Sequence, residues 1–245
     1  NQFLWLDATT LYVGTYGRGV WKTTVAAGDS VVSPQTGWWW NANESGRGFF
    51  IEKQNNNIFL AGYLYAADGR ATWFTSSGPV SGNSFTADML TFSNGQTLTG
   101  TYKAPAAGTS LGRLTVTFAT DSSATLSWPG GTIPLTRFTF GGTGASPIEN
   151  GWWWNASESG RGYSIEIQGN TLFMVGFMYD DVGNPLWYLS SGNITGTTAY
   201  QSSWQQVANG QTLTGAYKAP TVVNANVGSI RLDFSGRTTM NLTLP

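Results

Sequence analysis

The sequence contains no cysteine and no histidine. Without cysteine no disulfide framework can form, and without either residue the usual ligands of zinc, copper and haem are missing. The Ser-His-Asp and Cys-His catalytic mechanisms are excluded for the same reason. Only metal sites built from oxygen ligands stay open, and we expect no cofactor.

Charged residues are also scarce, at 10% of the chain, and the net charge is −1. A protein that binds nucleic acid needs a basic stripe or a positive groove to neutralise phosphates. Here Lys and Arg are scattered singly, so we expect no nucleic-acid partner. The chain is instead rich in glycine (32 residues), tryptophan (12 residues), hydroxyls and amides. This composition is typical of secreted β-proteins.

Long apolar runs are missing as well. No segment approaches the roughly 18 apolar residues that span a bilayer, so we expect no membrane span. No signal-peptide pattern is present and the first residue is not Met. We therefore interpret the chain as a fragment or a processed product.

Two phrases occur twice. GWWWNANESGRG (Gly37–Gly48) returns as GWWWNASESGRG (Gly151–Gly162), 114 positions later. NGQTLTGTYKAP (Asn94–Pro105) returns as NGQTLTGAYKAP (Asn209–Pro220), 115 positions later. A period of this length is too long for a solenoid repeat and indicates a duplicated domain.

Each repeat is a series of short segments rich in β-branched and aromatic residues, separated by Gly, Asn and Pro turns. The pattern predicts an all-β protein with two tandem antiparallel β-barrel or sandwich domains of about eight strands each. We favour the barrel because closure removes unpaired edges, which few charges protect here. The predicted domains are residues 36–143 and 149–245. The linker, residues 141–150, contains Gly and Pro and predicts some relative motion.

The second repeat lacks a counterpart of one segment. Residues 236–245 correspond to the segment that precedes Thr132–Phe140 in the first repeat, and no residues follow them. The second domain is therefore predicted to lack its last strand.

Residues 1–30 form a separate strand-rich leader. Within it, TLYVGTYGRGVWKTTV (Thr10–Val25) reads as a β-hairpin. The hairpin resembles the blade end of BNR-type β-propellers of sialidase-like and sortilin-like proteins, although it lacks their Asp-box. The resemblance implies a propeller upstream in a longer precursor.

The phrase GWWWN-x-x-ESGRG resembles a duplicated C-terminal module of secreted bacterial proteins that has no established activity. The resemblance covers most of residues 37–245, and both copies match the phrase in full. It implies a secreted, extracellular or cell-surface location and leaves the function open.

Catalysis is one interpretation of the repeated phrase. Glycoside hydrolysis commonly uses two carboxylates, and an arginine in the phrase could keep one of them ionised. If the chain is an enzyme, the candidate catalytic residues are Glu44, Glu52, Glu158 and Glu166.

Ligand binding is the second interpretation. Neighbouring residues on a strand face opposite ways, so Trp39 and Trp153 would point outward if the outer tryptophans of each triplet point inward. The opposite orientation would expose Trp38 and Trp40 instead. Exposed aromatic rings stack on carbohydrate or another surface polymer. The candidate ligand-binding residues are Trp39, Tyr65, Trp73, Trp153, Tyr179 and Trp187, with Tyr63 nearby.

A structural role is the third interpretation. The tryptophans then form the core, and ESGRG is a turn in which a glutamate pairs with an arginine three residues later. A second glutamate could share that guanidinium, which has five donors. The residues predicted to fix the barrel mouth in this way are Glu44, Arg47, Glu52, Glu158, Arg161 and Glu166.

YDDVGN (Tyr179–Asn184) is a candidate calcium site, because it carries two adjacent carboxylates. The shell of six to eight oxygens that calcium needs is not evident. We therefore predict no metal site.

The unmatched strand and the leader suggest two further hypotheses. The amino-terminal hairpin fills the vacancy within its own chain, or it fills the vacancy of a neighbour by strand addition, which propagates into a filament. Our leading prediction is a non-catalytic extracellular module that binds carbohydrate or another surface polymer within a larger secreted protein. The alternatives are a structural subunit that assembles by strand exchange and a glycoside hydrolase.

Overall fold

The computed structural model describes the backbone of residues 2–5, 10–15 and 19–24, and residues 32–142, 146, 148–196 and 198–245 in full. The leader strands β1 (Gln2–Trp5), β2 (Thr10–Thr15) and β3 (Gly19–Thr24) pair with one another as an antiparallel three-stranded sheet. No pairing joins these strands to the second repeat among the described residues. The hypothesis that the hairpin fills the vacancy of its own chain is therefore wrong.

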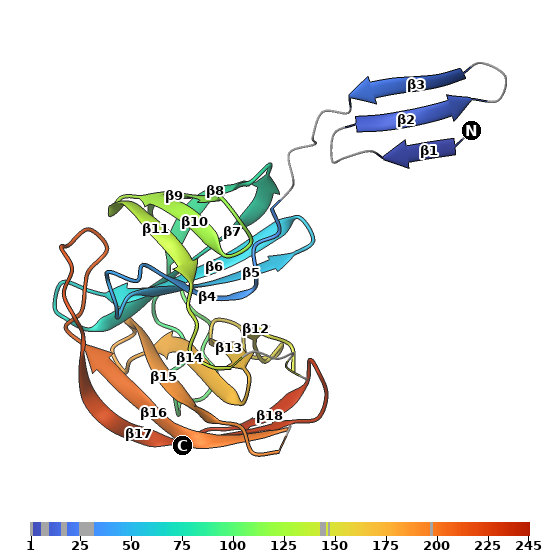
Figure 1. Cartoon of the computed structure of the whole chain (residues 1–245). Coiled ribbons are helices and arrows are strands. Elements are labelled where there is room, and N and C mark those ends of the chain that lie inside the picture. Colours follow the sequence, from blue (N-terminus) through green and yellow to red (C-terminus); the bar gives the residue numbers. More distant parts are fainter. Residues whose placement is uncertain are drawn as a thin grey trace.

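The first repeat is a closed eight-stranded barrel in which each strand pairs with the next and the last pairs with the first (Figure 1). Its strands are β4 (Gly37–Trp40), β5 (Gly48–Gln54), β6 (Asn57–Tyr65), β7 (Ala71–Ser81), β8 (Ser84–Thr91), β9 (Thr109–Phe118), β10 (Ser123–Trp128) and β11 (Gly131–Arg137). The predicted barrel is confirmed for this repeat.

The second repeat follows the same antiparallel meander but ends after seven strands, as a curled half-barrel. The strands are β12 (Gly151–Trp153), β13 (Gly162–Gln168), β14 (Thr171–Tyr179), β15 (Pro185–Asn193), β16 (Ala199–Ala208), β17 (Thr221–Phe234) and β18 (Met240–Thr243). β12 and β18 each have a partner on one side only. The prediction of an all-β fold with two tandem domains is confirmed, and the described residues contain no helix.

The structural correspondence of the repeats runs to the last residue of the chain. A Cβ at Gly112 would touch Pro129, and a Cβ at Gly228 would overlap Pro245. Pro245 therefore occupies the position of Pro129, at the turn that leads from β10 into β11. No described residue occupies the position of β11 in the second repeat.

Three hydrophobic clusters hold the chain together. One fills the closed barrel around Trp39, Phe49 and Phe85, and one fills the half-barrel around Trp204 and Tyr200. The third lies between the two sheets, with β7 against β15 and β4 against β13. The inner strands are thus apolar on both faces, because one face points into the barrel and the other into the interface.

The orientation of the tryptophan triplet differs from the one on which the binding interpretation rested. Trp39 is fully buried inside the barrel, whereas Trp38 points the other way into the interface between the repeats. In the second triplet Trp153 is also buried, in the core of the half-barrel. The expectation that Trp39 and Trp153 face outward is wrong. One side of the triplet strand packs on the core of its own repeat, and the other side packs on the opposite repeat.

The expected relative motion of the domains is also not what the structure shows. The interface cluster contains large aromatic side chains from both repeats, among them Trp38, Trp73 and Trp187. Burial of this apolar surface fixes the repeats against each other whatever the composition of the linker.

We predict that Trp39→Ala lowers the free energy of unfolding by about 3–5 kcal/mol, because it leaves a cavity in the barrel core. Urea denaturation followed by circular dichroism measures this loss. Trp154→Ala is the control: this side chain is 63% exposed, and we expect a change of less than about 0.5 kcal/mol. Equal losses for the two variants would contradict the assignment of Trp39 to the core.

Candidate functional site

The two repeated phrases meet each other across the interface. The ESGRG turn of the first repeat packs on the YKAP segment of the second, where a Cβ at Gly46 would overlap Pro220. The reciprocal contact places Gly160 against Pro105. Gly46 (φ 91°) and Gly160 (φ 98°) adopt a left-handed conformation that suits glycine. In each repeat the ESGRG turn therefore packs on the YKAP segment of the opposite repeat, so both copies of both phrases take part in the interface.

The backbone repeats this exchange. The amide of Asn94 donates to the carbonyl of Gly183 at 2.7 Å, and the amide of Asn209 donates to the carbonyl of Gly69 at 2.6 Å. Both asparagines have positive φ, which this residue type tolerates in turns. The Asn-Gly pairs thus form reciprocal links between the repeats, and they do not form a β-hairpin.

Four aromatic residues predicted to bind ligand are part of this interface. Trp73 Nε1 donates to the carbonyl of Met178 at 3.0 Å, and Trp187 Nε1 donates to the carbonyl of Leu64 at 3.1 Å. Tyr65 and Tyr179 are each 1% exposed. These side chains stabilise the contact between the repeats and are nearly fully buried, although Trp73 and Tyr179 also contribute to the wall of the groove described below.

The charged residues of the phrase pair locally, as the structural interpretation expected. Arg47 contacts Glu44 at 2.5 Å and Arg161 contacts Glu158 at 2.8 Å. Arg47 lies over the ring of Trp128, 4.9 Å from its centroid, and burial lowers the pKa of its guanidinium against the opposing effect of Glu44. Each turn is therefore closed by an ion pair at least one of whose members is buried or nearly so.

Arg161 also reaches the opposite repeat. Its Nη1 donates to the carbonyls of Thr97 and Leu98, both at 3.1 Å. This guanidinium therefore links the turn of the second repeat to the NGQTLTG segment of the first.

The second glutamate of each repeat crosses the interface. Glu166 accepts a hydrogen bond from the amide of Trp38 at 2.7 Å, and Glu52 accepts one from the amide of Trp152 at 2.6 Å. Neither glutamate shares the guanidinium of its own turn, so that part of the structural interpretation is wrong. The sequence could not show this, because Glu166 lies 128 positions from Trp38 and Glu52 lies 100 positions from Trp152.

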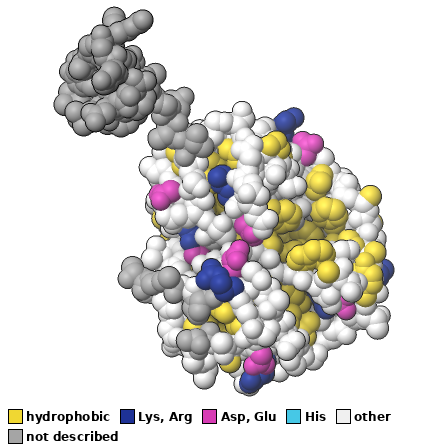
Figure 2. All heavy atoms as spheres, turned by 90° about the vertical axis from the view of Figure 1, so that its right-hand side faces the viewer, with side chains coloured by type: hydrophobic (Ala, Val, Ile, Leu, Met, Phe, Trp, Pro, Cys, Tyr) yellow, Lys and Arg dark blue, Asp and Glu magenta, His cyan; other side chains and the backbone are white. Residues whose placement is uncertain are grey.

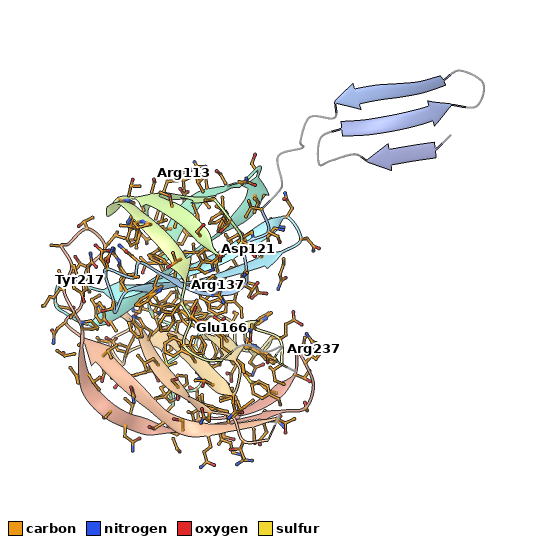
Figure 3. The ribbon with its side chains drawn as sticks, viewed as in Figure 1. Arg113, Asp121, Arg137, Glu166, Tyr217 and Arg237 are labelled. Atoms are coloured by element: carbon orange, nitrogen blue, oxygen red, sulfur yellow. The ribbon has the colours of Figure 1, made fainter. Side chains whose placement is uncertain are left out.

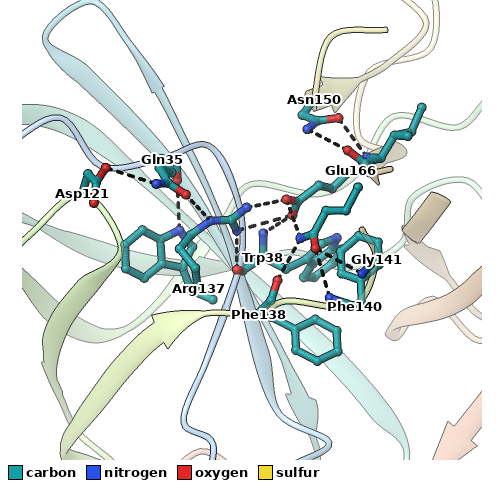
Figure 4. A network of polar contacts seen from close by, with 12 residues as sticks. Gln35, Trp38, Asp121, Arg137, Phe138, Phe140, Gly141, Asn150 and Glu166 are labelled. Carbon is teal, nitrogen blue, oxygen red and sulfur yellow. Dashed lines mark hydrogen bonds and ion pairs between the residues drawn. The ribbon is translucent and has the colours of Figure 1, made fainter. Parts of the chain in front are cut away.

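Glu166 has an arginine partner at the end of β11. Arg137 forms an ion pair with Glu166 and also donates to the carbonyl of Trp38 (Figures 3 and 4). The side chain of Glu166 is 2% exposed and that of Arg137 is 13% exposed. Gln168 Nε2 donates to the same carboxylate at 2.9 Å. This network joins the last strand of the first repeat to the second repeat.

Glu52 occupies the equivalent position without an arginine. It is 7% exposed, and its hydrogen bonds come from the amide of Trp152 and from Gln54 Nε2. No ion pair of Glu52 occurs within the described part of the chain. The difference follows from β11, because Arg137 lies at the end of that strand and no described residue occupies the equivalent position in the second repeat.

The same difference leaves a groove open beside Glu52. This cross-repeat groove is a hollow of about 800 Å³. Figure 2 shows one face of the molecule, on which exposed hydrophobic side chains gather in a patch. The aromatic wall of the groove comprises Phe59, Trp73, Phe92, Trp152, Trp153, Trp154, Phe177 and Tyr179. Its polar wall comprises Glu52, Gln54, Asn57, Thr75, Ser77, Ser159 and Arg161.

The equivalent groove of the other repeat is largely filled. There the hollow is only about 240 Å³ and is lined by Trp38, Trp39 and Trp40, which correspond to Trp152, Trp153 and Trp154. Phe138, from the residues that follow β11, lies 4.8 Å from Trp40 between ring centroids. The chain thus covers one of its two equivalent grooves with its own segment and leaves the other open.

A third hollow marks the open seam of the half-barrel. It has a volume of about 550 Å³ and is lined by residues of β12, its following turn, and β18. Trp153, Trp154 and Arg161 line both this seam and the cross-repeat groove. Seam and groove together therefore occupy the place that β11 and its following residues take in the first repeat.

Sequence reasoning missed the residues that distinguish the two grooves. No sequence pattern marks Arg137, Gln54 or Gln168. The same holds for the exposed rings of Trp154 (63%) and Phe59 (36%). One signal was present, because the segment that contains Arg137, Phe138 and Phe140 has no second copy. The unmatched segment, rather than the repeated phrase, indicates where the open site lies.

In the calcium candidate, the carboxylate of Asp180 stabilises the turn in which it lies. Asp180 accepts hydrogen bonds from the amides of Val182 at 3.1 Å and Asn184 at 2.7 Å. No group of three or more Asp or Glu residues suited to a metal ion occurs among the residues that the structure describes.

Within the described ranges, no helix has the length and apolar character required to cross a membrane. Comparison of the chain with family models, with curated proteins and with solved structures gave no match.

We predict that Glu166→Gln lowers the free energy of unfolding by about 3 kcal/mol, because it leaves the nearly buried Arg137 without its counter-charge. The matched variant Glu52→Gln removes a carboxylate that has no cation partner, so we expect a much smaller loss. Chemical denaturation of both variants measures the difference. A loss for Glu52→Gln as large as that for Glu166→Gln would contradict the asymmetry.

We also predict an alkaline loss of stability. Burial raises the pKa of Tyr65, Tyr179 and Tyr63 well above the ordinary value of 10. In the unfolded chain these groups ionise near pH 10 while the folded chain keeps them protonated. Their contribution to stability is therefore complete below pH 10 and declines as the pH rises above it.

Tyr65→Phe with Tyr179→Phe reduces this alkaline loss without loss of stability at pH 7, since neither hydroxyl has a hydrogen-bond partner in the described structure. Tyr63→Phe is the control, because its hydroxyl bonds to Ser164 at 2.6 Å and its removal costs about 1 kcal/mol at pH 7. Thermal denaturation from pH 8 to 11 measures both effects. A double variant with an unchanged alkaline slope would contradict the assignment.

Proposed function

We propose that the chain is a non-catalytic extracellular binding module and that its site is the cross-repeat groove, which receives an extended polymer. One observation carries the proposal: of two equivalent grooves, one is filled by the chain and the other is an aromatic-lined hollow of about 800 Å³. Large apolar hollows with a few polar groups are the usual form of binding sites. The extracellular setting rests on the composition and on the resemblance of the repeated phrase.

The proposed absence of catalysis rests on the partners of the four glutamates. Glu44 and Glu158 pair with the arginines of their own turns. Glu52 and Glu166 accept backbone amides across the interface. Each carboxylate is thus engaged in contacts within the protein, whereas a glycosidase needs two carboxylates that face one substrate.

Two classes of polymer fit the groove. An extended polypeptide is favoured by the open edges of β12 and β18, which offer unpaired backbone groups beside the groove. Carbohydrate is the second candidate, favoured by the exposed ring of Trp154 near the polar side chains of Gln54 and Asn57.

The test is a titration of the full chain with soluble polysaccharides and with an unfolded polypeptide, followed by tryptophan fluorescence. We expect a saturable change in emission, because Trp154 moves from solvent into contact with the ligand. Trp154→Ala should weaken binding roughly tenfold or more, as loss of a central aromatic anchor does.

The matched control is Trp40→Ala, which alters the equivalent position of the filled groove and should leave affinity unchanged. A chain that binds neither class of polymer, or whose affinity is insensitive to Trp154→Ala, would contradict the proposed site.

A further inference from the structure

Resting on the proposed function, we infer that the occupant of the cross-repeat groove is an extended polypeptide segment with an arginine followed by aromatic residues one and three positions later. Glu52 binds the arginine, Gln54 binds the backbone, and Trp154 and Phe59 pack on the aromatic residues. The first repeat supplies the template, because its own segment of this kind fills the equivalent groove.

The arginine is the first element of the template. β11 pairs with β4, with Arg137 opposite Trp39, and this register brings the guanidinium to Glu166 and to the carbonyl of Trp38. Glu52 is the equivalent acceptor: it already holds the amide of Trp152, as Glu166 holds that of Trp38. A counter-charge strongly stabilises a buried carboxylate, so the groove should bind a cation next to Glu52.

Arg161 lines the groove but does not supply that cation. Its guanidinium bonds to Glu158 at 2.8 Å and to two carbonyls of the first repeat. A counter-charge for Glu52 must therefore come from the occupant of the groove.

The backbone contact is the second element. Gln168 Nε2 donates to the carbonyl of Phe138 at 2.9 Å, while its Oε1 accepts from the amides of Phe140 at 3.0 Å and Gly141 at 3.3 Å (Figure 4). The amide side chain thus binds an extended main chain by both its donor and its acceptor. Gln54 lies at the equivalent position of the open groove, where its hydrogen bond goes to Glu52.

The aromatic contacts are the third element. Phe138 packs on Trp40 at 4.8 Å, and Phe140 packs on Phe173 at 5.6 Å, between ring centroids. The equivalents of Trp40 and Phe173 are Trp154 and Phe59, and both are exposed. In the open groove, Trp154 and Phe59 are therefore exposed, and no described side chain takes the place that Phe138 and Phe140 have in the filled groove.

The seam determines the class of the occupant. Insertion between β12 and β18 would continue the antiparallel meander and pair both edges, as β11 does between β10 and β4. Only a polypeptide uses these edges and the amide of Gln54 together, which argues against carbohydrate. A second copy of the chain is also a poor source, because its residues 131–141 are already held in its own barrel. The occupant is therefore a segment of the same chemistry other than residues 131–141.

The test uses the full chain and a synthetic peptide, GTIPLTRFTFG, which has the sequence of residues 131–141. We expect saturable binding of one peptide per chain by calorimetry, with a change in tryptophan emission. A peptide with citrulline in place of arginine keeps the shape and loses the charge, and should bind roughly tenfold more weakly or worse.

Glu52→Gln should weaken binding of the arginine peptide to a similar extent and leave the affinity for the citrulline peptide unchanged. This coupling separates a direct charge contact from a general structural effect. Gln54→Ala should weaken both peptides equally. Melting temperatures of the variants verify that each is folded.

A second arm supplies the segment within the chain. Residues 130–141 are appended after Pro245, in the order in which they follow Pro129 in the first repeat. This extended chain should melt at a higher temperature than the parent and should no longer bind the free peptide. The same extension with Arg137→Gln in the appended copy should gain less stability.

The inference is overturned if the peptide does not bind and the appended segment leaves the melting temperature unchanged. If a polysaccharide binds in a Trp154-dependent manner while the peptide does not, the groove keeps its proposed function and the inference about its occupant fails. If neither ligand binds, both fail. Equal affinity for the arginine and citrulline peptides overturns the role assigned to Glu52.

Discussion

The structure depends on a reciprocal exchange of buried polar contacts across an apolar interface. Glu166 and Glu52 each accept the amide that opens the tryptophan triplet of the other repeat, and Trp73 and Trp187 each donate to a carbonyl of the other repeat. An unpaired buried polar group costs as much as a lost hydrogen bond. The exchange therefore specifies one relative position of the two sheets, because apolar packing is non-directional and does not specify a position by itself.

The asymmetry of the two repeats has its origin in a single strand. β11 closes the first barrel, extends β4 as far as Trp40 by pairing with it, and sends Arg137 to Glu166. Without an equivalent strand, β12 ends at Trp153 and the next ring, that of Trp154, is exposed. An exposed ring, a buried carboxylate without a cation and an open seam are thus three results of one difference.

The fold was predictable from the sequence to a considerable degree. Short strands between glycine and asparagine turns indicated antiparallel meanders, and the unmatched segment at Thr132–Phe140 indicated the incomplete second domain. The orientation of the triplet was not predictable, because strand alternation gives two opposite faces without saying which one meets a partner sheet. Trp39 and Trp38 are both buried, and only the packing of the second repeat explains the latter.

The candidate site was predictable only in part. The local pairs Glu44–Arg47 and Glu158–Arg161 follow from their spacing, whereas Glu52, Glu166 and Arg137 are brought together by contacts over long separations. These contacts have a thermodynamic consequence. Since each ESGRG turn is completed by the YKAP segment of the opposite copy, neither half has a finished surface of its own. We therefore expect the chain to melt as one cooperative unit, despite a sequence that reads as two independent domains.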